Sequence, residues 1–300
     1  AQYPVKPIRM IVPSAPGSGP DIMARAIGQK LTEYLGQPIV IDDKPGAGGI
    51  IGAETAAKSA PDGYTLIMAN AGSHAVNASL YAKLPYDPVR DFAPITLVAM
   101  APNILIVHPA LPANSVRDLI ALAKSRPGEL TFGSGGNGST AHLSGEMFRT
   151  MAGINIVHIP FKGSPAAVVG VIAGQIAMAF PNIPPALPHV RSGKLKALAV
   201  TTAKRSAAVP ELPTVAESGL PDYAATAWFG LLAPAGTPGA IVAKLNAATV
   251  KSVHLRDMQD RLAAEGTEAV GNSPEQFAQI IRTDIAKWAK VVKASGAKAE

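Results

Sequence analysis

Short apolar runs alternate with amphipathic segments along most of this chain, and no other feature restricts its fold as strongly. Ile8–Val12 and Tyr64–Ala69 are apolar runs with the length of buried strands. Between them, Asp21–Leu35 places apolar side chains at helical spacing, Ile39–Ile41 is another short run, and Ala53–Ser59 follows a glycine-rich turn. Strands and helices that alternate in this way form parallel sheets covered by helices. The sequence therefore predicts an α/β fold.

The same alternation starts again after about residue 103, which predicts a second lobe built in the same way. Leu130–Phe132 and Ile154–Ile159 have the pattern of strands. The chain of 300 residues is about twice as long as a usual single domain, so two lobes are the expected number. The helices expected in the second half are Ser139–Met151, Pro165–Ile172, Pro238–Val253, Arg256–Glu265 and Pro274–Lys293.

Two uncharged stretches, 93–116 and 163–188, are each long enough to cross a bilayer. Four prolines interrupt the first stretch and five interrupt the second. Proline breaks the hydrogen bonding of a helix, and the freed backbone groups would find no partner in lipid. We therefore expect both stretches to form buried strands and short helices.

The charge of the chain favours a small anion as its partner. Lys and Arg exceed Asp and Glu by 27 to 21, but the basic residues form no continuous run and only 5% of residues are aromatic, which disfavours nucleic acid. No acid occurs between Glu146 and Glu211, so the second lobe should attract anions, although most of its basic side chains are expected to be solvated. The absence of cysteine excludes disulfides, thiolate metal sites and cysteine nucleophiles.

A glycine-rich loop, Gly133–Gly138, matches G-x-G-x-x-G between a predicted strand and a predicted helix. A dinucleotide site also needs an acid about 20 residues later to hold the ribose, and the segment Ile159–Lys162 has none, so we expect no such cofactor. Converging backbone N–H groups at a helix N-terminus would still favour an anion. The residues predicted to contact it are Ser134, Asn137, Gly138, Ser139 and Thr140.

A second loop of this kind, Ser14–Asp21, again joins a strand to a helix. We expect it to face the first loop across a cleft at the carboxyl ends of the strands. Asp21 can complement the helix dipole and pair with Arg25 one turn later, which accounts for it structurally. Gly46–Gly49 is interpreted as a turn that starts the next helix. The predicted ligand contacts of the second loop are Ser14, Ala15, Gly17, Ser18, Gly19 and Asp21.

The sequence offers little for catalysis. The six histidines are scattered, and no metalloprotease, nucleophile-elbow or Walker motif is present. His142 and Glu146 lie one turn apart on a predicted helix, but two ligands make a poor metal site, so a structural pair is expected. A binding protein explains hydrogen-bond donors without a nucleophile better than an enzyme does, and we expect neither a metal nor a cofactor.

Many short motifs, in one order along the whole chain, resemble the Bug family, the periplasmic substrate-binding proteins of tripartite tricarboxylate transporters. They are Tyr3-Pro4-x-Lys6-Pro7-Ile8, Pro13-x-Ala15-Pro16-Gly17 with Asp21 and Arg25, Pro45–Gly49, Pro61–Leu66, Leu84–Pro88, Asp91–Pro94, Gly138-Ser139 with His142-Leu143, Gly193–Ala199, Pro213–Glu217 and Ala233–Pro238.

The resemblance implies a two-lobed, type II-like periplasmic binding protein fold, each lobe a mostly parallel sheet flanked by helices, with two crossover strands. Residues 1–102 and 226–300 would form one lobe and 103–225 the other, with crossovers near Met100–Asn103 and Asp222–Ala227. It also implies a monomer that closes on a small organic carboxylate and delivers it to membrane transporter subunits. The resemblance adds Asn70, Lys162, Gly163 and Asn182 to the ligand contacts.

The chain departs from the family pattern at several positions. The family often has an aromatic residue where this chain has Ser14, and glycine where it has Ser18, which predicts a roomier pocket. Asn182 stands where some members have an acid, and the Asp that often follows Gly-Gln is absent after Gln175. An ammonium group would lack a counter-charge from the second lobe, so we expect a mono- or dicarboxylate without a free amine.

Localisation and two alternative functions complete the expectations. The start Ala1-Gln2-Tyr3-Pro4 without Met is what a cleaved secretory precursor leaves, as tag removal also would, so we expect a periplasmic protein whose signal peptide is removed. An orphan sensor that presents its ligand to a signalling partner is one alternative, which genomic neighbours would distinguish. An esterase or lyase on the same fold is another, which a turnover screen would detect.

Overall fold

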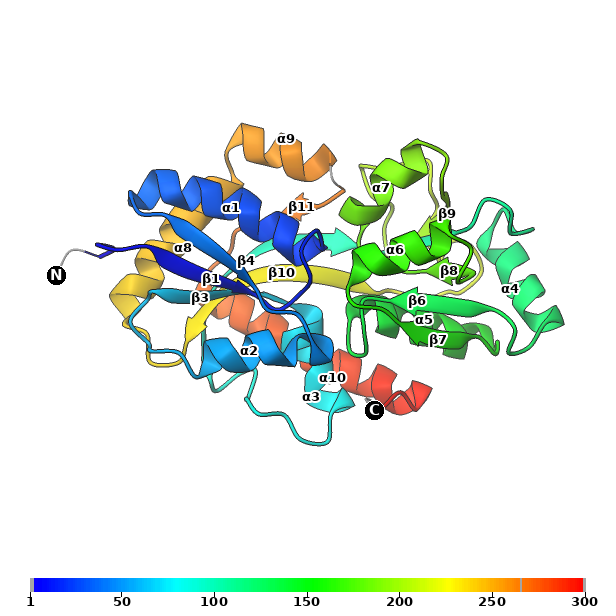
Figure 1. Ribbon diagram of the computed structural model, residues 1–300, viewed down its shortest axis with the longest axis horizontal. Coiled ribbons are helices and arrows are strands. Elements are labelled where there is room, and N and C mark those ends of the chain that lie inside the picture. Colours follow the sequence, from blue (N-terminus) through cyan, green and yellow to red (C-terminus); the bar gives the residue numbers. More distant parts are fainter. Residues whose placement is uncertain (1–2, 265, 299–300) are drawn as a thin grey trace.

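A computed structural model describes residues 3–264 and 266–298. The described residues form two sheets flanked by helices, side by side along the long axis of the molecule (Figure 1). The first part of the chain forms β1 (Ile8–Val12), α1 (Gly19–Leu35), β2 (Ile39–Asp43), the 3₁₀ turn η1 (Ala47–Gly49), α2 (Ile50–Ala57), β3 (Thr65–Asn70), the π-helical turn η2 (Gly72–Val76), α3 (Asn77–Leu80) and β4 (Phe92–Pro102).

The second sheet and its helices come from the middle of the chain. They are β5 (Ile104–Val107), α4 (Val116–Ser125), β6 (Thr131–Ser134), α5 (Thr140–Ala152), β7 (Val157–Pro160), α6 (Ser164–Ile172), β8 (Met178–Ala179), α7 (Ile183–Arg191) and β9 (Lys196–Val200). The chain then returns to the first sheet through β10 (Thr226–Pro234), α8 (Gly239–Val253), α9 (Arg256–Ala264), β11 (Glu268–Ala269) and α10 (Pro274–Ser295).

The α/β fold is as predicted, but both sheets are mixed rather than mostly parallel. The first has the order β11-β4-β10-β3-β1-β2, and the second has the order β7-β6-β8-β5-β9. β1 pairs in parallel with β2 and β3, as βαβ units require, and β6 pairs in parallel with β7 and β8. β4 and β5 take the chain from the first sheet into the second, and β10 returns it to the first sheet beside β4. The antiparallel pairs are those of β10 with β3 and β4 and of β5 with β8 and β9.

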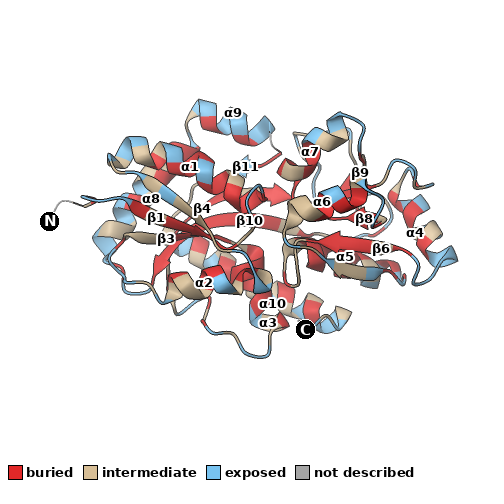
Figure 2. Ribbon diagram, in the orientation of Figure 1, coloured by how far each residue is buried: buried red, intermediate tan, exposed pale blue. Residues whose placement is uncertain are grey.

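Two strands connect the sheets. β4 and β10 pair from Thr226–Pro102 to Pro234–Phe92, and β4 runs through Asn103 directly into β5. Both strands are largely buried (Figure 2), so the link between the sheets is part of the hydrophobic core. The two glycine-rich loops, Ser14–Asp21 and Gly133–Gly138, lie at the carboxyl ends of β1 and β6, one in each sheet.

Local signals in the sequence fix several helix ends. Pro20 lies in the first turn of α1, and Gly36 ends it with φ +70°, a conformation that glycine adopts without steric cost. α10 begins with a capping box in which Ser273 and Gln276 satisfy each other's backbone N–H groups. Its buried stripe includes Trp288, and Asp284 accepts a 2.6 Å hydrogen bond from the indole N–H of Trp228 on β10. This hydrogen bond joins α10 to β10.

Two helical regions, α7 and the adjoining elements η2 and α3, are not predicted by the sequence pattern. α7 contains Pro184, Pro185 and Pro188, which we had expected to interrupt helix; the first two lie in its first turn, where proline is tolerated. The turn η2 and α3 have too little periodicity to be recognised. In the described part of the chain, no helix combines the length and the apolar character needed to cross a membrane.

Candidate ligand-binding site

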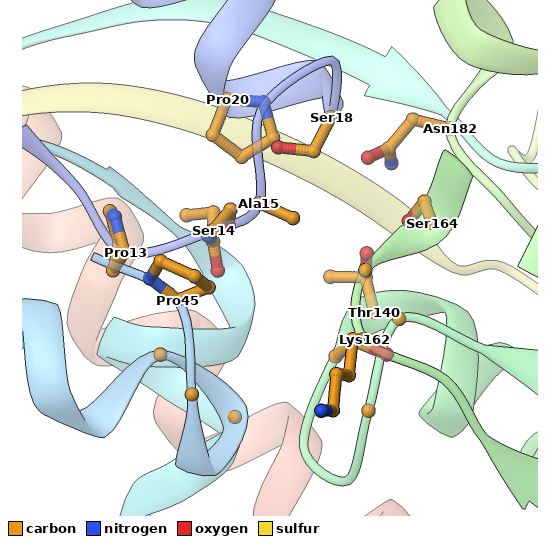
Figure 3. Close-up of a pocket in the computed structure, with 18 of the residues that line it drawn as sticks. Pro13, Ser14, Ala15, Ser18, Pro20, Pro45, Thr140, Lys162, Ser164 and Asn182 are labelled. Carbon is orange, nitrogen blue, oxygen red and sulfur yellow. Dashed lines mark hydrogen bonds between the residues drawn. The ribbon is translucent and has the colours of Figure 1, made fainter. Parts of the chain in front are cut away.

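A cavity of about 440 Å³ lies between the two sheets, within the size range of small-molecule sites. Figure 3 shows first-lobe residues such as Ser14 and Pro45 facing second-lobe residues such as Thr140 and Lys162 across it. Its lining consists of Pro13, Ser14, Ala15, Ser18, Pro20, Pro45, Gly46, Ala47, Gly48, Gly49, Asn70, Gly135, Gly136, Ser139, Thr140, Phe161, Lys162, Gly163, Ser164, Asn182, Ala227 and Phe229.

Helix N-termini converge on this cavity. Within the described residues, five helices have their N-cap residue on its wall: Ser18 for α1, Gly49 for α2, Ser139 for α5, Gly163 for α6 and Asn182 for α7. The first N–H groups of a helix have no partner within it, and its dipole places partial positive charge at this end. Five such ends, from both lobes, favour an anion in the cavity.

Side-chain hydrogen bonds fix the polar wall. Asn70 donates from Nδ2 to Ser14 Oγ at 3.3 Å, which joins the end of β3 to the loop after β1. Asn182 donates from Nδ2 to Asn103 Oδ1 at 2.6 Å, and Asn103 donates to Ser144 Oγ at 2.9 Å. Asn182 is therefore oriented by a residue of the strand crossover. The wall is preorganised, which reduces the entropy lost when a ligand binds.

The cavity carries positive charge without a balancing carboxylate. Lys162 is the one charged side chain among the described residues that line it. Asp21, which the sequence analysis placed in the site, is outside the lining and 3% exposed. Its carboxylate accepts the Gly17 N–H at 2.7 Å and pairs with Arg25 at 2.7 Å. Asp21 therefore supports the loop from behind the cavity lining, and its place among the ligand contacts stays a prediction.

The lining includes nine of the fifteen predicted contacts and excludes six. Besides Asp21, five residues lie outside it. Gly17 is exposed, whereas Gly19 is buried and a Cβ on it would lie 2.8 Å from the ring of Phe229. Ser134 is 1% exposed and bonds Gly136 and His158. Asn137 and Gly138 contact the first lobe instead. The nine lining residues are Ser14, Ala15, Ser18, Asn70, Ser139, Thr140, Lys162, Gly163 and Asn182.

Several lining residues escaped the sequence analysis. The segment Pro45–Gly49 does start a helix, as interpreted, but it also forms one wall of the cavity. Its glycine density was the available signal. Phe161, Ala227 and Phe229 are apolar, and nothing in their local sequence separates a cavity wall from a core position.

The two lobes touch around the cavity through glycines. A Cβ placed on Gly48 would lie 2.3 Å from the carbonyl oxygen of Asn137, and one on Gly163 would lie 2.6 Å from Ala15 Cβ. On Gly138 it would lie 2.2 Å from Asn77 Oδ1. Each contact joins segments from opposite lobes and leaves no room for a side chain, so the two lobes touch directly around the cavity.

The histidines near the site are structural. His142 Nε2 lies 4.0 Å from Glu146 Oε1, and Glu146 pairs more closely with Arg149, as expected of a structural pair. Ser134 Oγ lies 2.7 Å from His158 Nε2, but this buried serine does not reach the cavity as a nucleophile must. The described residues hold no group of three His, Cys, Asp or Glu that could bind a metal ion.

Comparison with known proteins agrees with this geometry. Residues 23–297 match the family model of the tripartite tricarboxylate transporter family receptor. BugT of Bordetella pertussis is 41% identical over 297 residues, which cover 99% of this chain and 91% of BugT. Rpa4515 of R. palustris, solved with adipate, is 39% identical with a TM-score of 0.96 over 99% of both chains.

A further solved relative is MatC from Rhodopseudomonas palustris with bound malate, 34% identical with a TM-score of 0.92 over 97% of this chain and 100% of MatC. These matches confirm the two-lobed fold and the resemblance to the Bug proteins. The chain belongs to the family of tripartite tricarboxylate transporter receptors, whose members are transport-associated binding proteins rather than enzymes.

Proposed function

We propose that this protein is a periplasmic receptor that captures a small organic carboxylate without a free amine and delivers it to the membrane subunits of a tripartite tricarboxylate-type transporter. The convergence of five helix N-termini on a cavity whose described lining holds one lysine and no acid carries the proposal. Family membership supports the transport role. The adipate of Rpa4515 and the malate of MatC support the carboxylate.

We further propose that the protein is a monomer and that residues 1–102 with 226–300 close against residues 103–225. The hinges would lie at Met100–Asn103 and Asp222–Ala227, where the chain passes between the two sheets. The glycine contacts around the cavity support this motion, because they can form only when the lobes meet.

A panel of organic acids, each paired with its α-amino analogue, tests the ligand class. We expect adipate or malate to raise the melting temperature, since a ligand at 100 times its Kd adds about 2.7 kcal/mol of stability. We expect 2-aminoadipate to bind about 100-fold more weakly than adipate, because its ammonium would be buried without a counter-charge. Calorimetry gives the two Kd values. Tighter binding of the amino acid would refute the charge argument, and no response to any acid would refute the function.

Lys162 is expected to select for a second carboxylate. Lys162→Met keeps most of the unbranched side chain and removes its ammonium group, so adipate should bind about tenfold more weakly, as expected for one charge-assisted hydrogen bond. Hexanoate, which has a single carboxylate, should lose much less affinity. Lys194→Met, an exposed change in the same lobe and outside the cavity lining, is the control. Equal losses for adipate and hexanoate would contradict this role.

A further inference from the structure

A line of polar contacts runs from the second-lobe ligand loop along one face of α5 to the opposite lobe. The Gly138 N–H donates to His142 Nδ1 at 3.2 Å, and His142 Nε2 lies 4.0 Å from Glu146 Oε1. Glu146 pairs with Arg149 at 2.6 Å, and Arg149 donates to the Ser295 carbonyl of α10 at 2.9 Å. Residues three and four apart share a helix face, so these side chains lie in one row, and only the 4.0 Å step from His142 to Glu146 is longer than a hydrogen bond.

A second imidazole completes the support of the loop. The His158 ring, on β7, stacks on the His142 ring with centroids 4.0 Å apart and 21° between the planes. His158 Nε2 lies 2.7 Å from Ser134 Oγ, which accepts the Gly136 N–H at 3.1 Å. One ring therefore holds Gly138 directly, and the other holds Gly136, a lining residue, through Ser134.

The hydrogen bond from the Gly138 N–H to His142 needs an uncharged His142 ring. A nitrogen that accepts a hydrogen bond carries no proton, so Nδ1 of His142 is bare while it holds Gly138. Burial lowers the pKa of His142 from 6.5 to about 3 and that of His158 from 6.5 to about 4, and the neighbouring His158 and Arg149 lower the pKa of His142 further.

We propose that the stacked pair His142–His158 positions the loop Gly135–Thr140 for the ligand, and that protonation of the pair releases the ligand in acid. The proposal rests on the function proposed above and adds its regulation. The charged groups that face the rings are Glu146 and Arg149 on α5; α10 contributes the Ser295 carbonyl on Arg149, and β6 contributes Ser134 and the Phe132 ring. Because Arg149 already neutralises Glu146, this acid gives little support to a charged imidazole.

The direction of the pH effect follows from the pKa shift. A ring freed from the stack returns toward its ordinary pKa of 6.5, so release of the loop takes up protons. When the pH falls below about 6.5, the equilibrium therefore shifts from the form in which the rings hold the loop to the form in which the loop is released. Above pH 6.5 both forms are neutral, and ligand affinity should not depend on these rings.

The experiment measures adipate binding by calorimetry in full-length variants. At pH 7.5, His142→Leu should bind adipate about tenfold more weakly than wild type, because the Gly138 N–H loses its acceptor. His142→Asn should restore binding to within about threefold, because its Oδ1 can replace Nδ1. His108→Leu is the matched control: its Nδ1 accepts the Ala110 N–H at 3.0 Å outside the cavity lining, and binding should not change.

Between pH 7.5 and 5.5, wild type should lose more affinity than His142→Asn; titration of adipate itself affects both equally. Three results would each overturn the proposal. They are wild-type affinity in a folded His142→Leu protein, equal losses of affinity in the Leu and Asn variants, and identical pH profiles of wild type and His142→Asn. If His142→Leu does not fold, His158→Phe replaces it, since phenylalanine keeps the stack and removes Nε2; unchanged binding there would overturn it equally.

The failure of the proposed function gives a different result. If wild type binds neither adipate nor malate, the function is wrong, and the positioning role is read from the NMR shifts of the Gly135, Gly136 and Gly138 amides. Those shifts should move in His142→Leu and largely return in His142→Asn. Unchanged shifts in His142→Leu would overturn the positioning role without any ligand.

Discussion

Gly48→Ala is expected to weaken adipate binding by about 30- to 100-fold and to leave the two lobes folded. Gly48 lies on the cavity wall with φ +63°, and a Cβ there would lie 2.3 Å from the carbonyl oxygen of Asn137 in the other lobe. A backbone atom cannot move aside as the end of a flexible side chain can, so the clash disfavours the closed form by about 2–3 kcal/mol. An open form has no such contact, and the affinity loss should therefore exceed the stability loss.

Gly153→Ala separates this effect from backbone strain. Gly153 ends α5 with φ +60°, almost the value at Gly48, but a Cβ there meets nothing within 4 Å. Both substitutions should cost similar stability for the left-handed conformation, and only Gly48→Ala should weaken binding. In small-angle scattering, saturating adipate should compact wild type and Gly153→Ala more than Gly48→Ala. Equal affinities of the two variants would mean that the glycine contact does not limit closure.

The sequence predicted the elements whose signals are local. The ends of α1 follow from Pro20 and Gly36, and apolar periodicity marks α5 and α10. The two glycine-rich loops at helix N-termini were found for the same reason, because conformational freedom and capping are properties of a few adjacent residues. Both loops do contribute to the cavity lining.

The parts that escaped prediction depend on contacts distant in sequence. Asn182 takes its orientation from Asn103, 79 residues away, and the helix it caps is rich in proline. Asp21 differs from Asn182, because its partners Gly17 and Arg25 are each four residues away and the pair with Arg25 follows from the sequence. Its position outside the cavity lining does not follow from the sequence. The first sheet is mixed because β10 returns beside β4 and β3, and the second is mixed because β5 runs antiparallel to β8 and β9. No local pattern encodes these pairings.

The second large effect concerns Gly145, in the middle of α5. Alanine usually stabilises an exposed helix position relative to glycine by about 0.5–1 kcal/mol, because glycine loses more backbone freedom on folding. At Gly145, however, a Cβ would lie 2.2 Å from Cε2 of Phe132 and 2.4 Å from its Cδ2. Phe132 is fully buried, and its ring packs against His158 and Phe180, so it has no space to move. The clash should therefore outweigh the gain in propensity.

Gly145→Ala should accordingly lower the free energy of unfolding by about 2–3 kcal/mol, the cost of overpacking a filled core. Urea denaturation measures this as a lower midpoint with an unchanged slope. Gly239→Ala is the matched control, because this glycine begins α8 and a Cβ there meets nothing within 4 Å. It should leave stability unchanged or raise it by up to about 0.5 kcal/mol. A Gly145→Ala protein as stable as Gly239→Ala would show that α5 can move away from β6. The close approach of this helix to the sheet beneath the loop Gly135–Thr140 would then not be a fixed part of the fold.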